Sequence, residues 1–323
     1  MPYLGWGVVA LLGLATLTWF GSVARIAAIA VVHDMLPVLL GLAWIVLLYG
    51  LITQQWLLAA TAALLVGFHL KLMLPRVFAD PTPAWVPSAA QLTVAVANVY
   101  VGNKTPEVAA ALLVGAGTEL LVVTERNDEF MRGFVQAGGV VAYPHTVDEP
   151  SGRPDYEIAI ASRVELLPGS RVLRVGSLRI VRAVVLCGDT ELSVVGVHLC
   201  AVTEPNGFRE WRHEVAALTN YVAELPAPFV VVGDFNSTGF RPAFTDPLRA
   251  AGLIEAHRAA GKGLTRSLKF AARGVLSLLP AMARVDHALL SPGVHALELV
   301  NLPTAGSDHH PFVMTLAVRQ PLA

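Results

Sequence analysis

The chain has 323 residues and an unusually apolar composition. Its mean hydropathy is +0.59 and only 15% of its residues are charged, whereas roughly a quarter are charged in a typical soluble protein. Five of the charged residues, Arg25, Asp34, Lys71, Arg76 and Asp80, lie before residue 83, which leaves 20 of the 23 basic and 22 of the 24 acidic residues for the remainder. The first part therefore has a lipid-compatible composition, and the second has a normal globular composition with a formal charge near −2.

Three apolar runs in the first part predict membrane-spanning helices over residues 3–20, 36–52 and 56–70. Trp6 and Trp19 lie near the ends of the first run, where amphipathic rings favour the membrane interface. Each run is slightly shorter than the ~20 residues that cross a hydrocarbon core as a helix, so two or four passes are alternatives to three. A buried helix bundle in a soluble protein is disfavoured because the sequence offers too little polar surface to cover it.

A proline-rich connector follows the third run. Residues 80–87 read Asp-Pro-Thr-Pro-Ala-Trp-Val-Pro, a pattern that cannot continue a helix and favours extended backbone. We therefore predict a transmembrane region of about three helices over residues 1–79, a linker over 80–90 and a globular domain over 91–323.

Short β-branched strands alternate with helical stretches in this second part, and Gly188-Asp189 marks the turn of a hairpin. The predicted strands cover residues 91–97, 120–124, 159–162, 181–186, 192–198, 229–232, 288–291 and 312–318, and the predicted helices cover 106–114 and 207–224. A mixed α/β domain with two stacked sheets would use this many strands.

Polar side chains gather at the ends of these strands. Each such residue alone is more often a turn or capping residue. Six endings that all carry acids, amides or imidazoles form a cluster that a packed core would not tolerate without a metal or a substrate. The endings are Asn98, Glu125, His198, Asp234 with Asn236, Asp286 with His287, and Asp308 with His309 and His310.

The order and spacing of these motifs resemble the endonuclease/exonuclease/phosphatase superfamily over about residues 91–319. The most specific elements are Gly-Asp-Phe-Asn at 233–236 and Ser-Asp-His at 307–309, and Arg-Val-Asp-His at 284–287 also matches. The resemblance implies a four-layered α/β sandwich, preceded here by the membrane helices. It also implies hydrolysis of phosphate mono- and diesters with Mg²⁺, or with Mn²⁺ as an alternative.

The resemblance implies that Glu125 is the principal metal ligand and that Asn98 and Asp308 lie near the metal. Carboxylate and amide oxygens suit a hard ion such as Mg²⁺, which keeps several waters and binds substrate phosphate.

The resemblance also implies roles in an in-line displacement at phosphorus by water. His309 would orient or deprotonate that water, and Asp286 would hold its imidazole. Asp234 would position the nucleophile or a proton, and Asn236 and His198 would donate to the non-bridging oxygens.

Other residues of the matching motifs are interpreted differently. Arg163 is interpreted as structural, and His287 and His310 as packing or supporting residues. Many members of the superfamily have a phosphate-contacting tyrosine shortly before a Ser-Arg pair, which is Ser162-Arg163 in this sequence. Here Asp155 rather than Tyr156 takes that place when no gap is introduced, so the role of Tyr156 stays open.

The net charge and the membrane region favour a lipid-linked phosphate as the substrate. A domain at −2 lacks the basic excess that neutralises nucleic-acid phosphates, so nucleic acid is disfavoured. One stretch, 266–284, interleaves apolar and basic residues and predicts either a surface that faces the membrane or an ordinary helix packed on the sheet. Its basic residues are Arg266, Lys269, Arg273 and Arg284, and its apolar residues include Leu268, Phe270, Val275, Leu276, Leu278 and Leu279.

Within the superfamily, three passes before such a domain resemble the actinobacterial membrane proteins linked to teicoplanin and vancomycin resistance. This resemblance implies a multi-pass protein of the cell membrane whose catalytic domain lies outside the cytoplasm and acts on a polyprenyl pyrophosphate. The positive-inside tendency, applied to Arg25, Lys71 and Arg76, would place the domain in the cytoplasm instead. Three charges are a small basis, and we give the resemblance more weight.

Two other functions remain open. One is a membrane-tethered nuclease or phospholipid diesterase that uses the same site. The other is a catalytically inactive membrane scaffold, against which the intact Glu125, Asp234, Asn236 and His309 argue.

Overall fold

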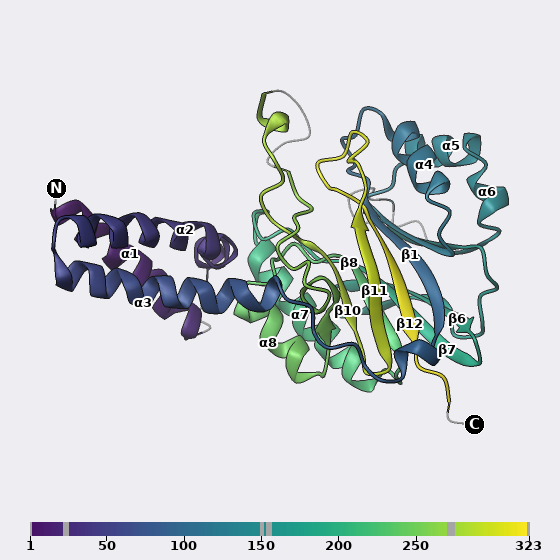
Figure 1. The fold of residues 1–323 in the computed structure, drawn as a ribbon. Helices are drawn as coiled ribbons and strands as arrows, with labels where there is room; N and C mark the ends of the chain where they lie inside the picture. The colour runs from purple at the N-terminus through teal and green to yellow at the C-terminus, as the bar shows by residue number, and fades with distance from the viewer. Residues whose placement is uncertain (1, 22–25, 149–151, 153–156, 270–274, 322–323) are drawn as a thin grey trace.

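Three long helices project from one side of an α/β domain in the computed structural model of the chain (Figure 1). The structure describes all residues except 1, 22–25, 149–151, 153–156, 270–274 and 322–323, and it does not describe the side chains of residues 2, 276 and 277. The N-terminus lies at the far end of the helical projection, and the α/β domain follows the third helix (Figure 1).

The three helices are α1 (Pro2–Phe20), α2 (Ala27–Ile52) and α3 (Trp56–Met73), and all three are long and apolar enough to cross a membrane. Their outward faces carry exposed apolar side chains such as Leu11, which is 71% exposed, and Leu64, which is 76% exposed. Water would not tolerate so much contiguous apolar surface, whereas lipid would cover it. The predicted number of apolar helices is confirmed.

Helix α2 begins at Ala27 rather than at residue 36 as predicted. Its first turns belong to the α/β domain, because Ala27, Ile29 and the fully buried Ala30 pack against the domain's hydrophobic core. Asp34 interrupts the apolar run in the sequence, but Arg241 of the domain pairs with its carboxylate. A contact between segments that are distant in sequence therefore extends this helix.

The α/β domain contains two six-stranded mixed sheets, in which the pairs β1/β2 and β7/β8 are parallel and the other neighbours are antiparallel. The order in the first sheet is β11 (Val294–Asn301), β12 (Phe312–Val318), β1 (Ala90–Asn98), β2 (Leu120–Thr124), β4 (Ile158–Ser162), β3 (His145–Asp148). The order in the second is β5 (Arg171–Val175), β6 (Leu178–Cys187), β7 (Thr190–His198), β8 (Phe229–Asp234), β10 (Asp286–Leu290), β9 (Ile254–Glu255).

The two sheets stack face to face on a dry aliphatic core. Val94 and Val122 of the first sheet and Val194 and Val232 of the second belong to one buried cluster. Gly196 lies where the two sheets are in close contact, since a Cβ there would be 3.1 Å from a methyl carbon of Val122. Nearly continuous β-branched runs are expected for strands that are buried on both faces.

Helices cover the outer face of each sheet and complete four layers. On the first sheet lie α4 (Pro106–Gly115), α5 (Asp128–Gln136) and α6 (Gly139–Ala142), and on the second lie α7 (Gly207–Glu224) and α8 (Pro242–Ala250). Among the described residues, the other helical turns are α9 (Ala256–Ala259), η1 (Leu74–Arg76), η2 (Val86–Ser88) and η4 (Val275–Leu278). The predicted four-layered sandwich is confirmed.

The described part of the stretch 266–284 is not one helix, and one of its basic residues is buried. Leu268 forms isolated β-bridges with Ala283 and His309, so the described residues are not one helix packed on a sheet. Arg284 is only 5% exposed and donates to the Thr265 carbonyl and to Asn301, so the prediction that it faces the membrane is wrong. Phe270, Arg273 and the side chain of Leu276 lie outside what the structure describes.

Candidate metal and catalytic site

Strands from both sheets bring the predicted polar residues to one end of the domain. In the first sheet, Asn98 is the last residue of β1, and Glu125 follows the end of β2 directly. In the second, the parallel pair β7/β8 places His198 opposite Asp234, and the antiparallel pair β8/β10 places Asp286 opposite Asp234. The register of the two sheets therefore gathers residues that lie far apart in the sequence.

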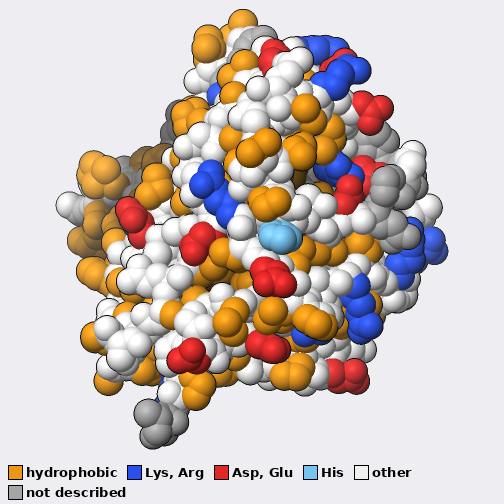
Figure 2. All heavy atoms as spheres, turned by 90° about the vertical axis from the view of Figure 1, so that its right-hand side faces the viewer, with side chains coloured by type: hydrophobic (Ala, Val, Ile, Leu, Met, Phe, Trp, Pro, Cys, Tyr) orange, Lys and Arg blue, Asp and Glu red, His pale blue; other side chains and the backbone are white. Residues whose placement is uncertain are grey.

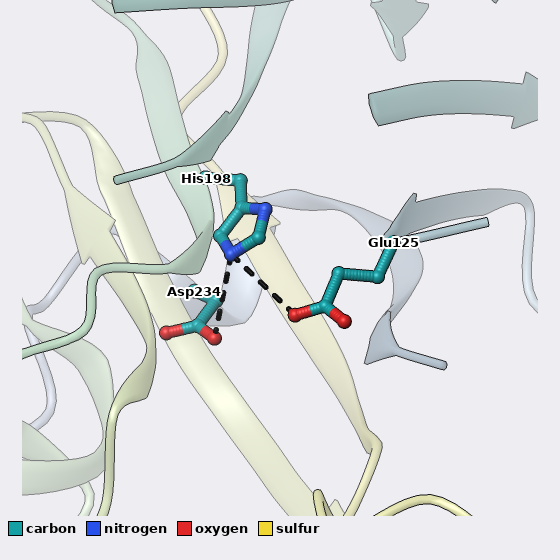
Figure 3. Close-up of side chains that lie close together, drawn as sticks. All are labelled: Glu125, His198 and Asp234. Atoms are coloured by element: carbon teal, nitrogen blue, oxygen red, sulfur yellow. Dashed lines mark ion pairs between the residues drawn. The ribbon is translucent and has the colours of Figure 1, made fainter. Parts of the chain in front are cut away.

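Glu125, His198 and Asp234 form the centre of the site (Figure 3). The His198 Nε2 atom lies between two carboxylates, 3.7 Å from Glu125 Oε1 and 3.8 Å from Asp234 Oδ2 (Figure 3). Asn98 links the same two acids, because its Nδ2 donates to Glu125 Oε1 at 2.8 Å and to Asp234 Oδ2 at 3.0 Å. The four side chains therefore form one polar cluster between the two sheets.

The backbone has an unusual conformation at Glu125 and at Gly233, the residue before Asp234. Glu125 has a φ of +55°, a left-handed conformation that is strained for a non-glycine residue and is found most often at functional sites. Gly233 has a φ of +139°, and a Cβ there would lie 1.9 Å from the Val197 carbonyl oxygen. Only glycine therefore allows β8 to approach β7 immediately before Asp234.

A buried histidine–aspartate pair adjoins the acids. His309 Nδ1 lies 2.8 Å from Asp286 Oδ2, and its Nε2 lies 3.8 Å from Asp234 Oδ2. Two serines support the pair. The Ser267 hydroxyl accepts from the Asp286 amide, and the Ser307 hydroxyl accepts from the His309 amide while it donates to the Asn98 carbonyl. The imidazole orientation is therefore fixed from both sides.

Burial and neighbouring charges shift the pKa values of the buried acids and of His309 in different directions. Burial and the adjacent charge of Asp286 raise the pKa of Asp234. Burial would also raise the pKa of Asp286, but the charge of His309 and its hydrogen bond hold that pKa below its ordinary value. Burial disfavours a charged His309, yet the carboxylates of Asp286 and Asp234 raise its pKa to about 10. Burial raises the pKa of Asp308, and the charge of Glu125 adds to this shift.

Asn236 and Asp308 complete the set of residues that the sequence predicted. The Asn236 amide donates to Asp234 Oδ1 at 2.8 Å, and its side-chain Nδ2 donates to the Leu199 carbonyl at 2.7 Å. A primary amide has two N–H donors, so one remains for another acceptor. Asp308 precedes His309, and its backbone carbonyl accepts from the Lys269 amide.

The arrangement fits a divalent cation of the hard type. One ligand atom from each of Glu125, His198 and Asp234 lies within 4.8 Å of the others, as do atoms of Asp234, Asp286 and His309. Among the described residues, no donor reaches the buried Oδ1 atoms of Asp286 and Asp308. Clustered carboxylates that repel one another and retain unsatisfied oxygens are the ligands that Mg²⁺ or Mn²⁺ prefers.

The structure brings the residues predicted for the site together, and it shows contacts that the sequence did not indicate. The sequence did not associate Asp234 and His198 with the ion, although they share the centre with Glu125. It also missed Ser267, which carries no local signal because it lies far from the motifs. Asn98 directs its amide nitrogen toward the two acids, whereas its Oδ1 accepts from the Tyr100 amide. In this arrangement Asn98 orients the acids.

Residues interpreted as structural do lie outside the centre. The His287 ring contacts the rings of Phe235 and Phe244. Its Nε2 atom is bonded to the Ser237 carbonyl. His310 Nδ1 is bonded to the Leu302 carbonyl. The Arg163 guanidinium stacks 5.0 Å above the Tyr143 ring. Tyr156 lies outside the described residues.

A family model describes this sequence pattern and covers most of the α/β domain. The model of the endonuclease/exonuclease/phosphatase family matches residues 84–309. The chain belongs to this family. Members of the family are generally metal-dependent phosphoester hydrolases, and the acidic and imidazole cluster at the strand ends could hold such a metal. No curated protein matches the chain in sequence.

Solved structures share the fold at low sequence identity. An endonuclease/exonuclease/phosphatase protein from Beutenbergia cavernae has a TM-score of 0.55 and 16% identity, over 71% of this chain and 72% of that one. TDP2 of D. rerio in complex with a single-strand DNA product has a TM-score of 0.56 and 16% identity, over 70% of this chain and 98% of that one. A family protein from Bacteroides thetaiotaomicron has a TM-score of 0.52 and 18% identity, over 71% and 98%. At such identities the likeness establishes the fold.

Proposed function

We propose that the protein is a membrane-anchored, divalent-metal-dependent phosphohydrolase or phosphodiesterase that acts on a lipid-linked phosphate, such as a polyprenyl pyrophosphate. The observation that carries this proposal is the joining of two features. The site has the acid, amide and imidazole groups of a phosphoester hydrolase, and the domain that holds it contacts helices suited to a membrane. We also propose the division into a membrane region over 1–79, a linker over 80–90 and a catalytic domain over 91–323.

The proposed metal ligands are Glu125, with Asn98 and Asp308 close to the ion, and the geometry adds Asp234 and His198 as further candidates. When bound, a divalent ion supplies Lewis-acid activation of the phosphate. Asn98 donates to the carboxylates of both Glu125 and Asp234, and these two hydrogen bonds keep both acids oriented toward the centre of the site.

The proposed catalytic steps use the chain's own proton carriers. His309 Nε2 would orient the attacking water, because Asp286 holds the opposite ring nitrogen. With its pKa raised to about 10, the imidazole is protonated at neutral pH, so it would deprotonate the water only after it has lost its own proton. Asp234, whose pKa burial raises, would position the water or a proton. His198 and the remaining N–H of Asn236 would donate to the non-bridging oxygens as their negative charge grows.

The resemblance to antibiotic-resistance membrane proteins supports the choice of a polyprenyl pyrophosphate and of an extracytoplasmic domain. The cavity at the junction of the helices and the domain also supports a substrate that arrives along the membrane. Its lining joins Pro37 and Met73 of the helices with Arg266 and Met282 of the domain. Apolar and cationic groups therefore meet at the level where a lipid phosphate would lie.

A nuclease or phospholipid diesterase remains the second candidate. TDP2, which shares the fold, has a solved complex with single-strand DNA, so the weak net charge of the domain does not by itself exclude nucleic acid. On the face turned away from the membrane helices, acidic and basic side chains are interspersed (Figure 2). This one face therefore provides no marked electrostatic attraction for nucleic acid, and the substrate panel decides between the two candidates.

One substrate panel tests the proposal. Hydrolysis by the full chain in detergent micelles is measured on a polyprenyl pyrophosphate, a phospholipid, a nucleotide and an oligonucleotide, each with Mg²⁺ and with a chelator. Released phosphate reports cleavage of the pyrophosphate and the nucleotide, whereas the phospholipid and the oligonucleotide are followed by separating their cleavage products, because hydrolysis of a diester frees no inorganic phosphate. We expect metal-dependent turnover that is fastest on the lipid pyrophosphate. Faster turnover of the oligonucleotide would favour the nuclease, and no turnover of any substrate would favour the inactive scaffold.

A further inference from the structure

All three membrane helices contact one short loop of the α/β domain. The loop consists of residues 237–241, directly after the Gly-Asp-Phe-Asn motif, and it leads into α8 beside the junction with the helices (Figure 1). From α1, Trp19 Nε1 donates to the Phe240 carbonyl at 2.6 Å. In η1, which continues α3 directly, Arg76 donates to the Gly239 carbonyl, and its guanidinium lies 4.0 Å above the Phe240 ring.

The contact from α2 is the most extensive. Asp34 is the only acidic residue of the three helices. Its Oδ1 accepts from the Thr238 amide at 3.0 Å and from the Thr238 hydroxyl at 2.8 Å, and its other oxygen pairs with Arg241. Arg241 is fully buried, and its guanidinium stacks 4.5 Å from the Trp211 ring. An acid in an apolar helix is unfavourable unless it is paired in this manner.

The same loop is tied to the catalytic residues on its other side. Asn236, whose φ is +47°, is held by bonds to Asp234 and to the Leu199 carbonyl. The carbonyl of Ser237 is bonded to His287, the residue that follows Asp286. A shift of Thr238 would therefore be transmitted within two residues to Asn236, and a displacement of less than 1 Å changes catalytic rates substantially.

We propose that Asp34 is a positioning residue of the active site, which acts through its two hydrogen bonds to Thr238 to hold Asn236 and Asp234 in place. The membrane region is then part of the catalytic architecture in addition to being an anchor. This inference rests on the proposed phosphoesterase function for its kinetic consequence, whereas its structural consequence can be measured independently.

The decisive comparison is between Asp34→Ala and Asp34→Asn in the full chain in detergent micelles. Both variants leave Arg241 without an anionic partner, but asparagine keeps a side-chain oxygen that can accept from Thr238. With bis(4-nitrophenyl) phosphate, a soluble diester, and Mg²⁺ or Mn²⁺, we expect Asp34→Ala to lower kcat by about 10-fold or more and to leave KM nearly constant. Asp34→Asn should retain most of the wild-type kcat.

Amide hydrogen exchange provides the second readout. The Asn236 amide does not bond to Asp34, so faster exchange there in Asp34→Ala reports transmission through the loop. Asp80→Ala is the matched control, since it removes another ion pair between the membrane-proximal segment and the domain, that of Asp80 with Arg258, without touching the loop. It should change neither kcat nor exchange at Asn236.

The outcomes distinguish a failure of the positioning role of Asp34 from a failure of the proposed phosphoesterase function. Equal loss of kcat in Asp34→Ala and Asp34→Asn would show that only the ion pair matters, and wild-type kcat and exchange in Asp34→Ala would also overturn the proposal. If Asp34→Ala does not fold, Thr238→Val replaces it and should lower kcat and hasten exchange at Asn236 to a smaller degree; no change would count against the inference. If the wild type hydrolyses no diester, the proposed function fails, and exchange at Asn236 alone decides the role of Asp34.

Discussion

Glu125 combines a strained backbone with two hydrogen bonds that aim its carboxylate at the centre of the site. Its Oε2 accepts from the Val101 amide at 3.0 Å, and its Oε1 accepts from Asn98 at 2.8 Å. Neither bond belongs to the hydrophobic core, and 16% of the side chain remains exposed. The residue is therefore placed for chemistry, and its removal should leave the fold intact.

We predict that Glu125→Ala lowers metal-dependent turnover by at least about 100-fold, since loss of a hard-ion ligand weakens both binding and activation. Turnover is measured over a Mg²⁺ titration, with thermal unfolding of the same samples as a check on the fold. Glu129→Ala is the control, because Glu129 has an exposed pairing with Arg132 on α5. Full activity of chelator-treated wild type would contradict the metal-dependent mechanism.

The buried pair of His309 and Asp286 predicts a pH-dependent stability. The pKa of His309 is about 10 in the folded protein against 6.5 as its ordinary value. A raised histidine pKa stabilises the fold fully below pH 6.5, and this stabilisation declines as the pH rises toward 10. The depressed pKa of Asp286 adds stability that is lost only in acid, as the pH falls through its folded pKa.

Asp286→Asn should therefore destabilise the metal-free protein, and it should do so more at pH 6 than at pH 10. Thermal unfolding of both proteins in chelator across this range measures the difference. The imidazole would also lose its fixed tautomer, so kcat should fall by several orders of magnitude, as when a triad carboxylate is replaced by its amide. A destabilisation that grows with pH would contradict the assigned charges.

The candidate site residues that the sequence predicted lie close together in the structure, because they follow neighbouring strands in short motifs. Asp34 shows where sequence reasoning fails. The aspartate and Thr238 are 204 residues apart, and an acid within an apolar run indicates only that some partner exists. No local pattern identifies that partner, since the contact depends on how the helices dock against the domain.

At the scale of elements, the central strands were predicted and the peripheral ones were not. Strands β2, β7, β8 and β12 carry near-continuous apolar runs, which is the signal of strands inside a sandwich. The four missed strands, β3, β5, β9 and β11, all lie at sheet edges. The first three are short, and β11 contains an irregularity between Ala296 and Glu298. Helix α8 was missed because Pro247 lies inside it, and proline normally argues against a helix interior.

The segment before β10 carries exposed apolar residues. Val275 and Leu278 are each 83% exposed, and Leu279 is 45% exposed. In Figure 1 this yellow-green segment lies on the side of the domain from which the helices emerge. Its neighbour Met282 lines the cavity shared with α2 and α3. We therefore expect these side chains to contact the membrane surface.

We predict that Leu278→Ser combined with Leu279→Ser impairs hydrolysis of a long-chain lipid phosphate in liposomes. Withdrawal of two partly inserted leucines costs about 1 kcal/mol each, so KM for the liposomal substrate should rise roughly ten-fold or more. Turnover of a soluble ester should stay constant, because no residue of the site is changed.

The matched control changes two exposed valines of α6, Val140 and Val141, to serine. They are 54% and 86% exposed and lie on the side of the domain opposite the membrane helices (Figure 1). Both substrates should be unaffected by this pair. Equal losses on the soluble and liposomal substrates in the leucine variant would show that the segment supports the fold and does not contact lipid.

At the scale of the whole molecule, the docking of the helices changes how the charges near the membrane are interpreted. Arg76 donates to the Gly239 carbonyl and Asp34 pairs with Arg241, so both charges belong to the junction with the domain. The positive-inside tendency counts cations that flank the membrane, and here one of the three serves a structural contact. The charge count is thus a weaker guide to orientation than it was in the sequence alone.

We predict that the N-terminus lies in the cytoplasm and the α/β domain outside it, which three passes require of opposite chain ends. A green fluorescent protein fused after residue 323 should be dark, and alkaline phosphatase at the same position should be active. As the matched control, the same reporters fused after Gln54, between α2 and α3, should give the opposite result because only two passes precede them.

Fluorescence of the full-length fusion would place the domain in the cytoplasm, where a polyprenyl pyrophosphate would have to be presented from the inner leaflet. Equal results at both positions would instead show that the number of passes is even between them, in conflict with α3 as a span.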